Sequence, residues 1–204
     1  MLFIAGPNGS GKTSMFSLLD EHGGERGFPF INADLIARLA AGVPAADQLA
    51  QKIADLVREH MLGQRTNFAT ETVFSDEKNA KLDYLRRAEE AGFRVVMIYV
   101  TLANWQLSKM RVEFRVREHA GHDVPAEKLQ RRFVASRMNC RRALAQVETS
   151  IIIDNSLRHK PLRPMAVLSR GKLLYSVKRL PPYIQDLLPE ANQLPEPSEA
   201  ASDT

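Results

Sequence analysis

The sequence is poor in cysteine and contains no long hydrophobic run. With one cysteine, Cys140, among 204 residues, the chain can form neither an internal disulfide framework nor a cysteine-based zinc site. Its longest apolar run is VVMIYV, far short of the roughly 18 residues that a membrane span needs. The first residues, MLFIAGPNG, lack the basic region and the apolar core of a signal peptide. We therefore expect a cytoplasmic protein that does not contact a membrane.

Aromatic residues are also few, at 7%, whereas the hydrophobic share of 44% and the charged share of 25% are typical of a globular protein. Lysine and arginine number 28 against 24 acidic residues, so the net charge is +4. Residues 109–142 hold ten basic and four acidic residues, whereas residues 190–204 hold four acidic residues and no basic one. We expect one domain over residues 1–188 and an acidic, disordered tail over residues 189–204.

Short apolar runs alternate with helical patterns along the chain. The apolar runs predict strands at residues 2–5, 30–31, 66–70, 93–101 and 151–153. The helical patterns cover residues 34–41, 44–63, 77–91, 105–117 and 125–147, and residues 166–169 and 172–177 predict a C-terminal β-hairpin. In the helix at 44–63, Leu49 and Ile53 lie on the apolar face and Arg58 on the polar face. The alternation indicates a three-layer α/β/α fold with a mostly parallel sheet.

One segment matches the phosphate-binding pattern G-x-x-x-x-G-K-[ST]. It consists of Gly6, Pro7, Asn8, Gly9, Ser10, Gly11, Lys12 and Thr13. The glycines let backbone N–H groups converge on phosphate oxygens, the lysine reaches the β and γ phosphates, and the threonine hydroxyl binds Mg²⁺. The segment lies between an apolar strand and an amphipathic helix, as the pattern requires. These features predict a P-loop NTPase that binds ATP or GTP together with Mg²⁺.

The phosphate loop does not identify the reaction, because pumps, switches and small-molecule kinases share it. A motor ATPase needs a long apolar strand that ends in an acidic residue, whereas the strand at 93–101 ends in Thr101. An arginine-rich segment follows this strand, and no second nucleotide motif is present. We therefore predict a kinase-like P-loop NTPase with a helical lid over the phosphates.

Three polar residues follow predicted strands, at the edge of the sheet where ligands bind in open α/β folds. Asp34 could accept a proton from a substrate hydroxyl as general base, or cap the helix that follows it. Glu71 could contact the substrate or be a solvated loop acid. Thr72 could be a second polar contact or only a turn residue. Near the end of the chain, Asp154 and the two residues after it could border the adenine, or Asp154 could cap a turn.

The basic segment 109–142 offers a second group of candidates. Arg111 and Arg115 are four residues apart on one helix face, so both could reach one anionic ligand. In phosphoryl transfer such guanidinium groups offset the charge that builds up on the transferred group. The alternatives are a solvated helix surface and a nucleic-acid site. Nucleic acid is disfavoured because the only aromatic residues here are Phe114 and Phe133, and we expect Phe114 to face the core.

Taken in order, several segments resemble the zeta toxin family of P-loop kinases, especially its compact bacterial branch. They are AGPNGSGKTS, FINADLIA, FATETVFS, GFRVVMIYVTL, RVEFRVREHAGHDVP, RRFVASRMN and IIIDNS. The resemblance covers about residues 1–180. It implies transfer of the γ-phosphoryl group of ATP to the 3′-hydroxyl of the amino sugar in UDP-N-acetylglucosamine. It also implies a possible partner, a small helical antitoxin that covers the ATP site.

The resemblance also implies roles for individual residues. Asp34 corresponds to the catalytic base, Glu71 and Thr72 to substrate-holding residues, and Arg111 to the first phosphate-neutralising arginine. The second lid arginine of the family has no clear counterpart. His122 stands near its place, and Arg115 or Arg117 could substitute for it.

We accordingly predict a kinase that uses Mg²⁺ and ATP, with Lys12, Asp34 and Arg111 as catalytic residues. Its acceptor is expected to be a small anionic molecule, with a UDP-sugar as the first candidate. Two alternatives are a nucleic-acid end kinase or RNA-binding ATPase, and a non-catalytic ATP-binding half of a toxin–antitoxin pair.

Overall fold

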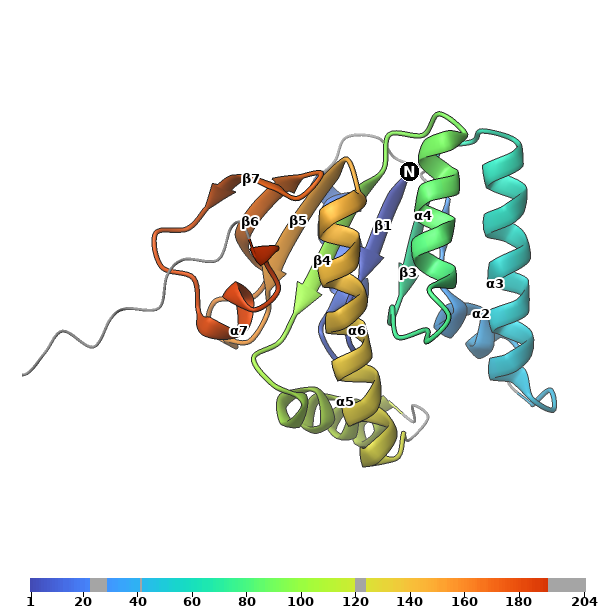
Figure 1. Cartoon of the computed structure of the whole chain (residues 1–204). Helices are drawn as coiled ribbons and strands as arrows, with labels where there is room; N and C mark the ends of the chain where they lie inside the picture. Colours follow the sequence, from blue (N-terminus) through green and yellow to red (C-terminus); the bar gives the residue numbers. More distant parts are fainter. Residues whose placement is uncertain (23–28, 41, 120–123, 191–204) are drawn as a thin grey trace, which may run out of the picture.

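A seven-stranded sheet forms the centre of the molecule in a computed structural model, which describes residues 1–22, 29–40, 42–119 and 124–190. In chain order the strands are β1 (Leu2–Ala5), β2 (Phe30–Ile31), β3 (Ala69–Thr72), β4 (Val96–Thr101), β5 (Thr149–Asp154), β6 (Arg163–Ser169) and β7 (Lys172–Ser176). In space they lie in the order β2-β3-β1-β4-β5-β6-β7. The first five are parallel, and β6 and β7 are antiparallel. The sheet is therefore mostly parallel, with the predicted hairpin at one edge (Figure 1).

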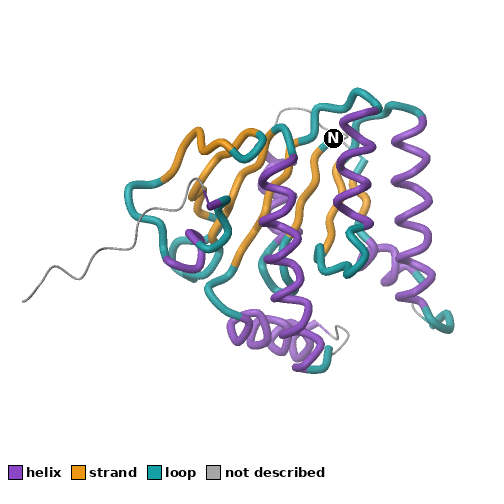
Figure 2. Tube along the Cα trace, viewed as in Figure 1, coloured by secondary structure: helices purple, strands orange, loops and turns teal. Residues whose placement is uncertain are grey.

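Helices cover both faces of this sheet and complete the three predicted layers (Figure 2). One face is covered by α1 (Lys12–His22), and the other by α3 (Ala46–Gly63), α4 (Ala80–Glu90) and α6 (Ala126–Gln146). Two more helices, α2 (Ala33–Leu39) and α5 (Trp105–His119), lie near the carboxyl ends of the parallel strands. The short helix α7 (Pro182–Gln185) follows the hairpin and was not predicted.

Strand β4 shows why an apolar run with no polar alternation lies at the centre. Successive side chains of a strand point to opposite faces of the sheet. Met97 and Tyr99 pack into the core beneath α3, α4 and α6, whereas Ile98 and Val100 pack into the smaller core beneath α1. All four side chains are at most 3% exposed. The run VVMIYV is thus buried on both sides, as a central parallel strand requires.

Most of the predicted elements are confirmed, but one boundary shift matters for the site. The strand expected at 66–70 is β3, which begins at Ala69 and ends at Thr72. The reason is its pairing with β1, which runs from Leu2 beside Ala69 to Ala5 beside Thr72. Glu71 therefore belongs to the strand, and its side chain contacts Lys12 and Thr13, the last residues of the phosphate loop.

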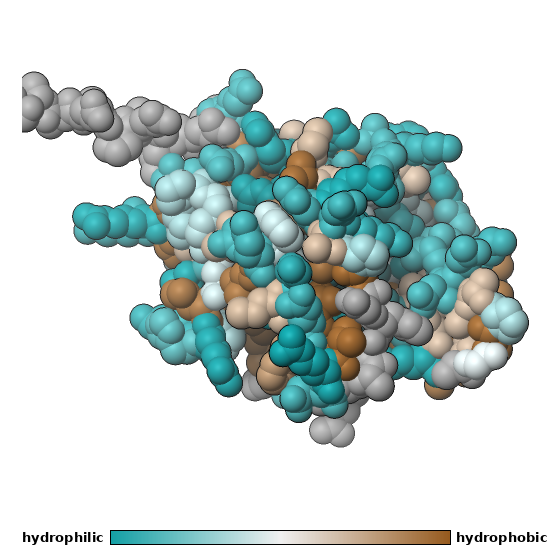
Figure 3. Space-filling view, turned by 90° about the horizontal axis from the view of Figure 1, so that it is seen from below, coloured by the Kyte–Doolittle hydropathy of each residue, from teal (hydrophilic) through white to brown (hydrophobic). Residues whose placement is uncertain are grey.

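Two expectations about helix faces are wrong. Arg58, placed on the polar face of its helix, is only 3% exposed, whereas Leu49 on the expected apolar face is 40% exposed. Phe114, expected to face the core, is 65% exposed. It lies on α5, which buries Ser108 and Val112 instead, and the face of the molecule that carries α5 shows hydrophobic side chains among hydrophilic ones (Figure 3).

Among the described residues, no helix is both long and apolar enough to cross a membrane. Residues 191–204, most of the predicted acidic tail, lie outside the described part of the chain.

Candidate active site

The phosphate loop connects β1 to α1 and lies where the ends of β1, β3, β4 and β5 meet. Gly6 begins it at a φ of +148°. A Cβ atom at this residue would lie 2.2 Å from the carbonyl oxygen of Val100, so only glycine fits where the loop passes the end of β4. The close approach brings the loop between β4 on one side and β3 on the other.

Lys12, Thr13 and Glu71 form a polar cluster at the end of the loop, in which Lys12 is buried and Thr13 is exposed. Lys12 is 7% exposed and donates a hydrogen bond from Nζ to the Pro7 carbonyl at 3.2 Å. Its Nζ lies 3.7 Å from Glu71 Oε1, and Thr13 Oγ1 donates to Glu71 Oε2 at 2.8 Å. Burial lowers the pKa of Lys12, while the carboxylates of Glu71 and Asp34 act in the opposite direction. The cluster ties β3 to both functional side chains of the loop.

Asn32 takes the capping role that was one interpretation of Asp34. Its side-chain oxygen accepts from the N–H groups of Asp34 and Leu35 at 2.8 and 3.3 Å, so Asn32 is the cap of α2. Its Nδ2 donates to Glu71 at 2.9 Å. Asp34 is therefore not needed as a cap. It stands in the first turn of α2, exposed, and close enough to Lys12 to raise the pKa of that lysine.

Arg58 on α3 holds the end of β3 through hydrogen bonds. Its Nε donates to Thr70 Oγ1 at 2.7 Å, and its Nη2 donates to the Glu71 carbonyl at 3.3 Å. Asp55 accepts from the same guanidinium. Because these bonds hold the side chain of Thr70 and the carbonyl of Glu71, Arg58 fixes the strand that carries the acid. The helical pattern of residues 44–63 contained no signal for this, since it depends on a contact with β3.

Thr13 and Glu71 provide two oxygen groups at the end of the loop that suit a metal ion. Mg²⁺ in nucleotide sites takes one or two protein oxygens and completes its coordination with phosphate and water. A hydroxyl and a carboxylate held 2.8 Å apart fit this requirement. Within the described ranges, no group of three or more histidine, cysteine, aspartate and glutamate residues could hold a metal by itself.

Helix α5 lies directly against the phosphate loop. Ser108 Oγ donates to the Asn8 carbonyl at 2.6 Å, and Arg111 Nη1 lies 3.5 Å from the Gly9 carbonyl as a long donor contact. Burial lowers the pKa of Arg111, and the charge of Asp154 acts in the opposite direction. The helix predicted as a lid therefore contacts the loop through its own first half.

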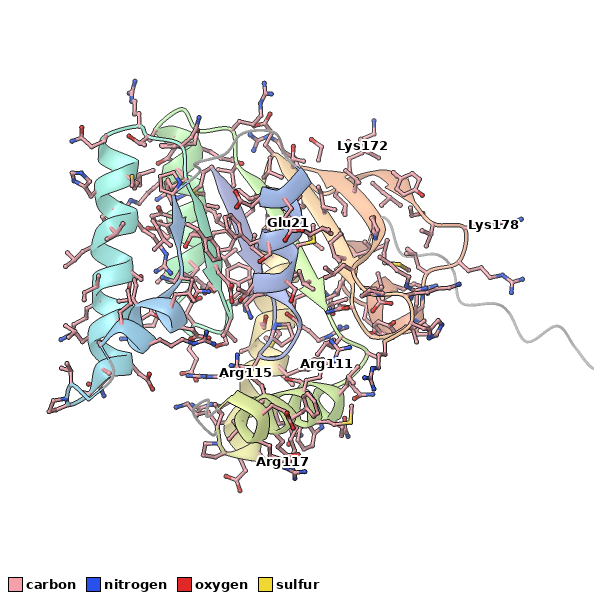
Figure 4. All side chains as sticks on the ribbon, turned by 180° about the vertical axis from the view of Figure 1, so that it is seen from behind. Glu21, Arg111, Arg115, Arg117, Lys172 and Lys178 are labelled. Carbon is pink, nitrogen blue, oxygen red and sulfur yellow. The ribbon has the colours of Figure 1, made fainter. Side chains whose placement is uncertain are left out.

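The arginines of α5 do not all reach the loop. Arg111 and Arg115 lie on the side of the helix that faces it, whereas Arg117 lies on the opposite side (Figure 4). Arg117 is six positions after Arg111, and at about 100° per residue the two side chains lie about 120° apart around the helix axis. Arg115 is close enough to Lys12 to lower its pKa further. Among the described residues, Arg115 Nε is buried without a hydrogen-bond partner.

Arg132 on α6 is a cation at this site that the sequence interpretation missed. Burial lowers the pKa of its guanidinium, and the carboxylates of Asp34 and Asp47 act in the opposite direction. Within the described part of the chain, it makes no hydrogen bond or ion pair. Its neighbour Arg131 is instead 74% exposed and lies 4.0 Å from Glu77. Only the fold brings Arg132 close enough to Asp34 for the two charges to interact, because about 100 residues of sequence separate them.

The other candidates lie as follows. The Thr72 hydroxyl accepts from the Phe74 N–H at 3.1 Å, so it serves the turn after β3. Asp154 is fully buried and accepts hydrogen bonds from Ser156, Arg163 and Tyr183. Burial raises the pKa of Asp154, but these hydrogen bonds outweigh it and hold the pKa below its usual value. His122 lies outside the described residues.

A family model described as zeta toxin matches residues 1–159. The chain belongs to the zeta toxin family. This confirms the resemblance carried by the sequence motifs. The sequence argument against a motor ATPase looked for an acidic residue at the end of the strand at 93–101, which ends in Thr101. In the structure the acidic residue beside the phosphate loop is Glu71 on β3, which lies on the other side of β1 from β4.

Solved structures share this zeta toxin fold at low sequence identity. The complex of AvrRxo1-ORF1 with AvrRxo1-ORF2 matches with a TM-score of 0.68 and 18% identity, over 95% of this chain and 65% of that chain. The PezAT toxin–antitoxin system of Streptococcus pneumoniae gives a TM-score of 0.59 and 14% identity, over 80% of this chain and 69% of that chain. A putative kinase from Chloroflexus aurantiacus gives 0.55 and 15%, over 78% and 90%.

These likenesses show a kinase-type P-loop fold. The chain spans only 60–65% of the length of the AvrRxo1 chains that it matches. A search among curated proteins finds no match.

Proposed function

We propose that this zeta toxin family member is a kinase that uses ATP and Mg²⁺ to phosphorylate a hydroxyl of a small anionic acceptor. UDP-N-acetylglucosamine is the first candidate, as the family resemblance implies. The observation that carries the proposal is the cluster of Lys12, Thr13 and Glu71, with Asp34 and Arg115 both close enough for their charges to act on Lys12. A phosphate held at this cluster would have a carboxylate base and a guanidinium group close by.

The nucleotide would be held by the loop. Backbone N–H groups of the loop and the Lys12 ammonium would bind the phosphates of ATP; Pro7 has no N–H group, and the N–H of Ser10 donates to the Pro7 carbonyl. Thr13 and Glu71 would hold Mg²⁺, which would screen the charge of the β and γ phosphates when bound. This assigns Glu71 to the metal side of the site, in place of the substrate-holding role that the resemblance implied.

Asp34 would act on the acceptor. Its exposed carboxylate orients the acceptor hydroxyl and takes its proton. The acceptor oxygen forms a bond to the γ phosphorus while the bond from that phosphorus to the β–γ bridging oxygen breaks, and ADP leaves with the electron pair. Arg111 and Arg115 offset the charge on the transferred group, a role that Arg117 cannot share from the far side of α5. Arg132 would attract the negative groups of the acceptor.

Incubation with ATP, Mg²⁺ and a panel of UDP-sugars, nucleosides and oligonucleotides tests the proposal, with product masses as the readout. We expect an added mass of one phosphoryl group on a UDP-sugar and on no oligonucleotide. The Asp34→Asn variant should bind ATP like the parent protein and lose transfer by roughly 10²-fold or more. Transfer at the parent rate by Asp34→Asn would refute the base assignment, and phosphorylated oligonucleotide would favour the nucleic-acid end kinase.

A protein partner is also proposed, namely a small helical antitoxin. The proposal is supported by two relatives of the fold, which were solved as an ORF1:ORF2 complex and as a toxin–antitoxin system. Copurification of this chain with the product of a neighbouring reading frame, and loss of ATP binding in the complex, would support it. Equal ATP affinity with and without that product would contradict coverage of the ATP site.

A further inference from the structure

Asn155 directly follows β5 and joins three parts of the chain next to the phosphate loop. Its backbone N–H donates to the Thr101 carbonyl at 3.1 Å, at the end of β4. Its side-chain Nδ2 donates to the Ser10 carbonyl at 2.7 Å, and its Oδ1 accepts from the Leu162 N–H at 3.2 Å. The residue is 9% exposed. Both ends of the amide are therefore used, and one of them is used by the loop.

The bond to Ser10 determines the orientation of one loop amide. The peptide between Ser10 and Gly11 is planar and trans, so its N–H points away from its C=O. Because the carbonyl is directed at Asn155, the Gly11 N–H is directed to the opposite side, which is where an anion in the loop would lie. Hydrogen bonding of α1 begins at the same place, since the Met15 N–H donates to the Gly11 carbonyl at 2.9 Å.

The side chain of Asn155 also explains the glycine at position 11. Gly11 has a φ of +93°, and a Cβ atom there would lie 2.5 Å from Asn155 Nδ2. Any other residue would displace the amide from Ser10. The two residues therefore fit each other: the glycine leaves room for the amide of Asn155.

The third contact of Asn155 ties the loop to the connection between β5 and β6. Leu162 in this connection has a φ of +50° and packs against the core formed by Ile4 and Met15 beneath α1. Asp154, the residue before Asn155, forms an ion pair with Arg163 of β6. The asparagine thus stands on a rigid support that includes residues beyond the 1–159 segment matched by the family model.

We propose that Asn155 is a positioning residue that orients the Ser10–Gly11 peptide and so prepares the loop for the phosphates of ATP. This inference rests on the proposed function only in that the loop binds ATP, because the acceptor does not contact Asn155. Its effect should appear in nucleotide affinity and in the KM for ATP. The KM for the acceptor should be unchanged.

The Asn155→Asp variant tests the proposal with little change in size. Its carboxylate can still accept from Leu162, but it places an oxygen opposite the Ser10 carbonyl where the donor was. We expect the Kd for ATP in the presence of Mg²⁺, measured by calorimetry, to rise by about tenfold or more, because a hydrogen bond is replaced by repulsion. Asn139→Asp is the matched control: Asn139 is 3% exposed and also donates to backbone carbonyls, those of Phe74 and Asp76. It should bind ATP within about twofold of the parent protein.

Thermal unfolding with and without ATP separates positioning from mere stability. Both variants should melt earlier than the parent protein without nucleotide, but only Asn155→Asp should lose most of the ATP-induced rise in Tm. Asn155→Ala, which removes the donor without adding charge, should show the same loss in a smaller measure. ATP affinity within twofold of the parent for both Asn155 variants would overturn the proposal, as would an equal loss in Asn139→Asp. If the parent protein binds ATP but transfers no phosphoryl group to any acceptor, the kinase proposal is refuted. The effect of the Asn155 variants on ATP affinity still tests the positioning role.

Discussion

The ion pair between Lys12 and Glu71 makes a quantitative prediction about stability. Both side chains are nearly buried, at 7% and 9% exposure, so neither charge can be solvated if its partner is removed. The change Glu71→Gln keeps the size of the side chain and an oxygen that can accept from Thr13 and Asn32. What it removes is the negative charge opposite Lys12.

The expected cost is about 2 kcal/mol. Leaving one charge of a buried pair without its partner costs roughly 3–5 kcal/mol. The 3.7 Å separation is longer than a hydrogen bond, and the carboxylate of Asp34 still stabilises the charge of Lys12, so we expect a cost below this range. For a domain of this size, such a loss corresponds to a fall in Tm of about 4–8 °C. Removal of the other partner, in Lys12→Met, should lower the free energy of unfolding by less, because Glu71 still accepts hydrogen bonds from Thr13 and Asn32.

Urea unfolding of the nucleotide-free protein, carried out on both single variants and the double variant, measures the pair directly. The double variant should be more stable than the sum of the single losses predicts, with a coupling energy of about 1–2 kcal/mol. Losses that simply add, or a cost below about 0.5 kcal/mol for Glu71→Gln, would refute the view that burial makes this pair interdependent.

Three further predictions follow from other contacts. Arg58→Met should lower the free energy of unfolding by about 2–4 kcal/mol in urea titrations, because Thr70 and the Glu71 carbonyl lose their buried donor; a loss below about 1 kcal/mol would contradict its role beneath β3. Asp154 has a folded pKa below its unfolded value of 3.8, so its stabilisation is complete above that pH and is lost as pH falls through the folded pKa. The stability gap between Asp154→Asn and the parent protein should therefore narrow in unfolding curves below about pH 4, and a constant gap would contradict the shift. Arg132→Gln should raise the KM for an anionic acceptor by about tenfold without changing the KM for ATP, whereas the exposed neighbour Arg131 should tolerate the same change in steady-state assays; equal effects of the two would exclude an acceptor-side role for Arg132.

What the sequence by itself determined is local in origin. The glycines of the phosphate loop, the lysine and threonine after it, and the alternation of apolar runs with helical patterns depend on residues close to one another in the chain. Each could therefore be recognised without knowledge of the fold. The same holds for the hairpin around Gly171, because its two strands and its turn are adjacent in the chain.

The tertiary structure alone decided which distant residues complete the site. Strand order places β3, and not only β4, beside β1, and this brings Glu71 to Thr13. Arg58 was misplaced because a buried guanidinium is stable only where a partner strand offers acceptors, and periodicity cannot show that partner. Asn155 reaches Ser10 across 145 residues of sequence for the same reason. Long-range packing and the pairing of buried polar groups depend on the whole chain at once, and so they appear only when it is folded.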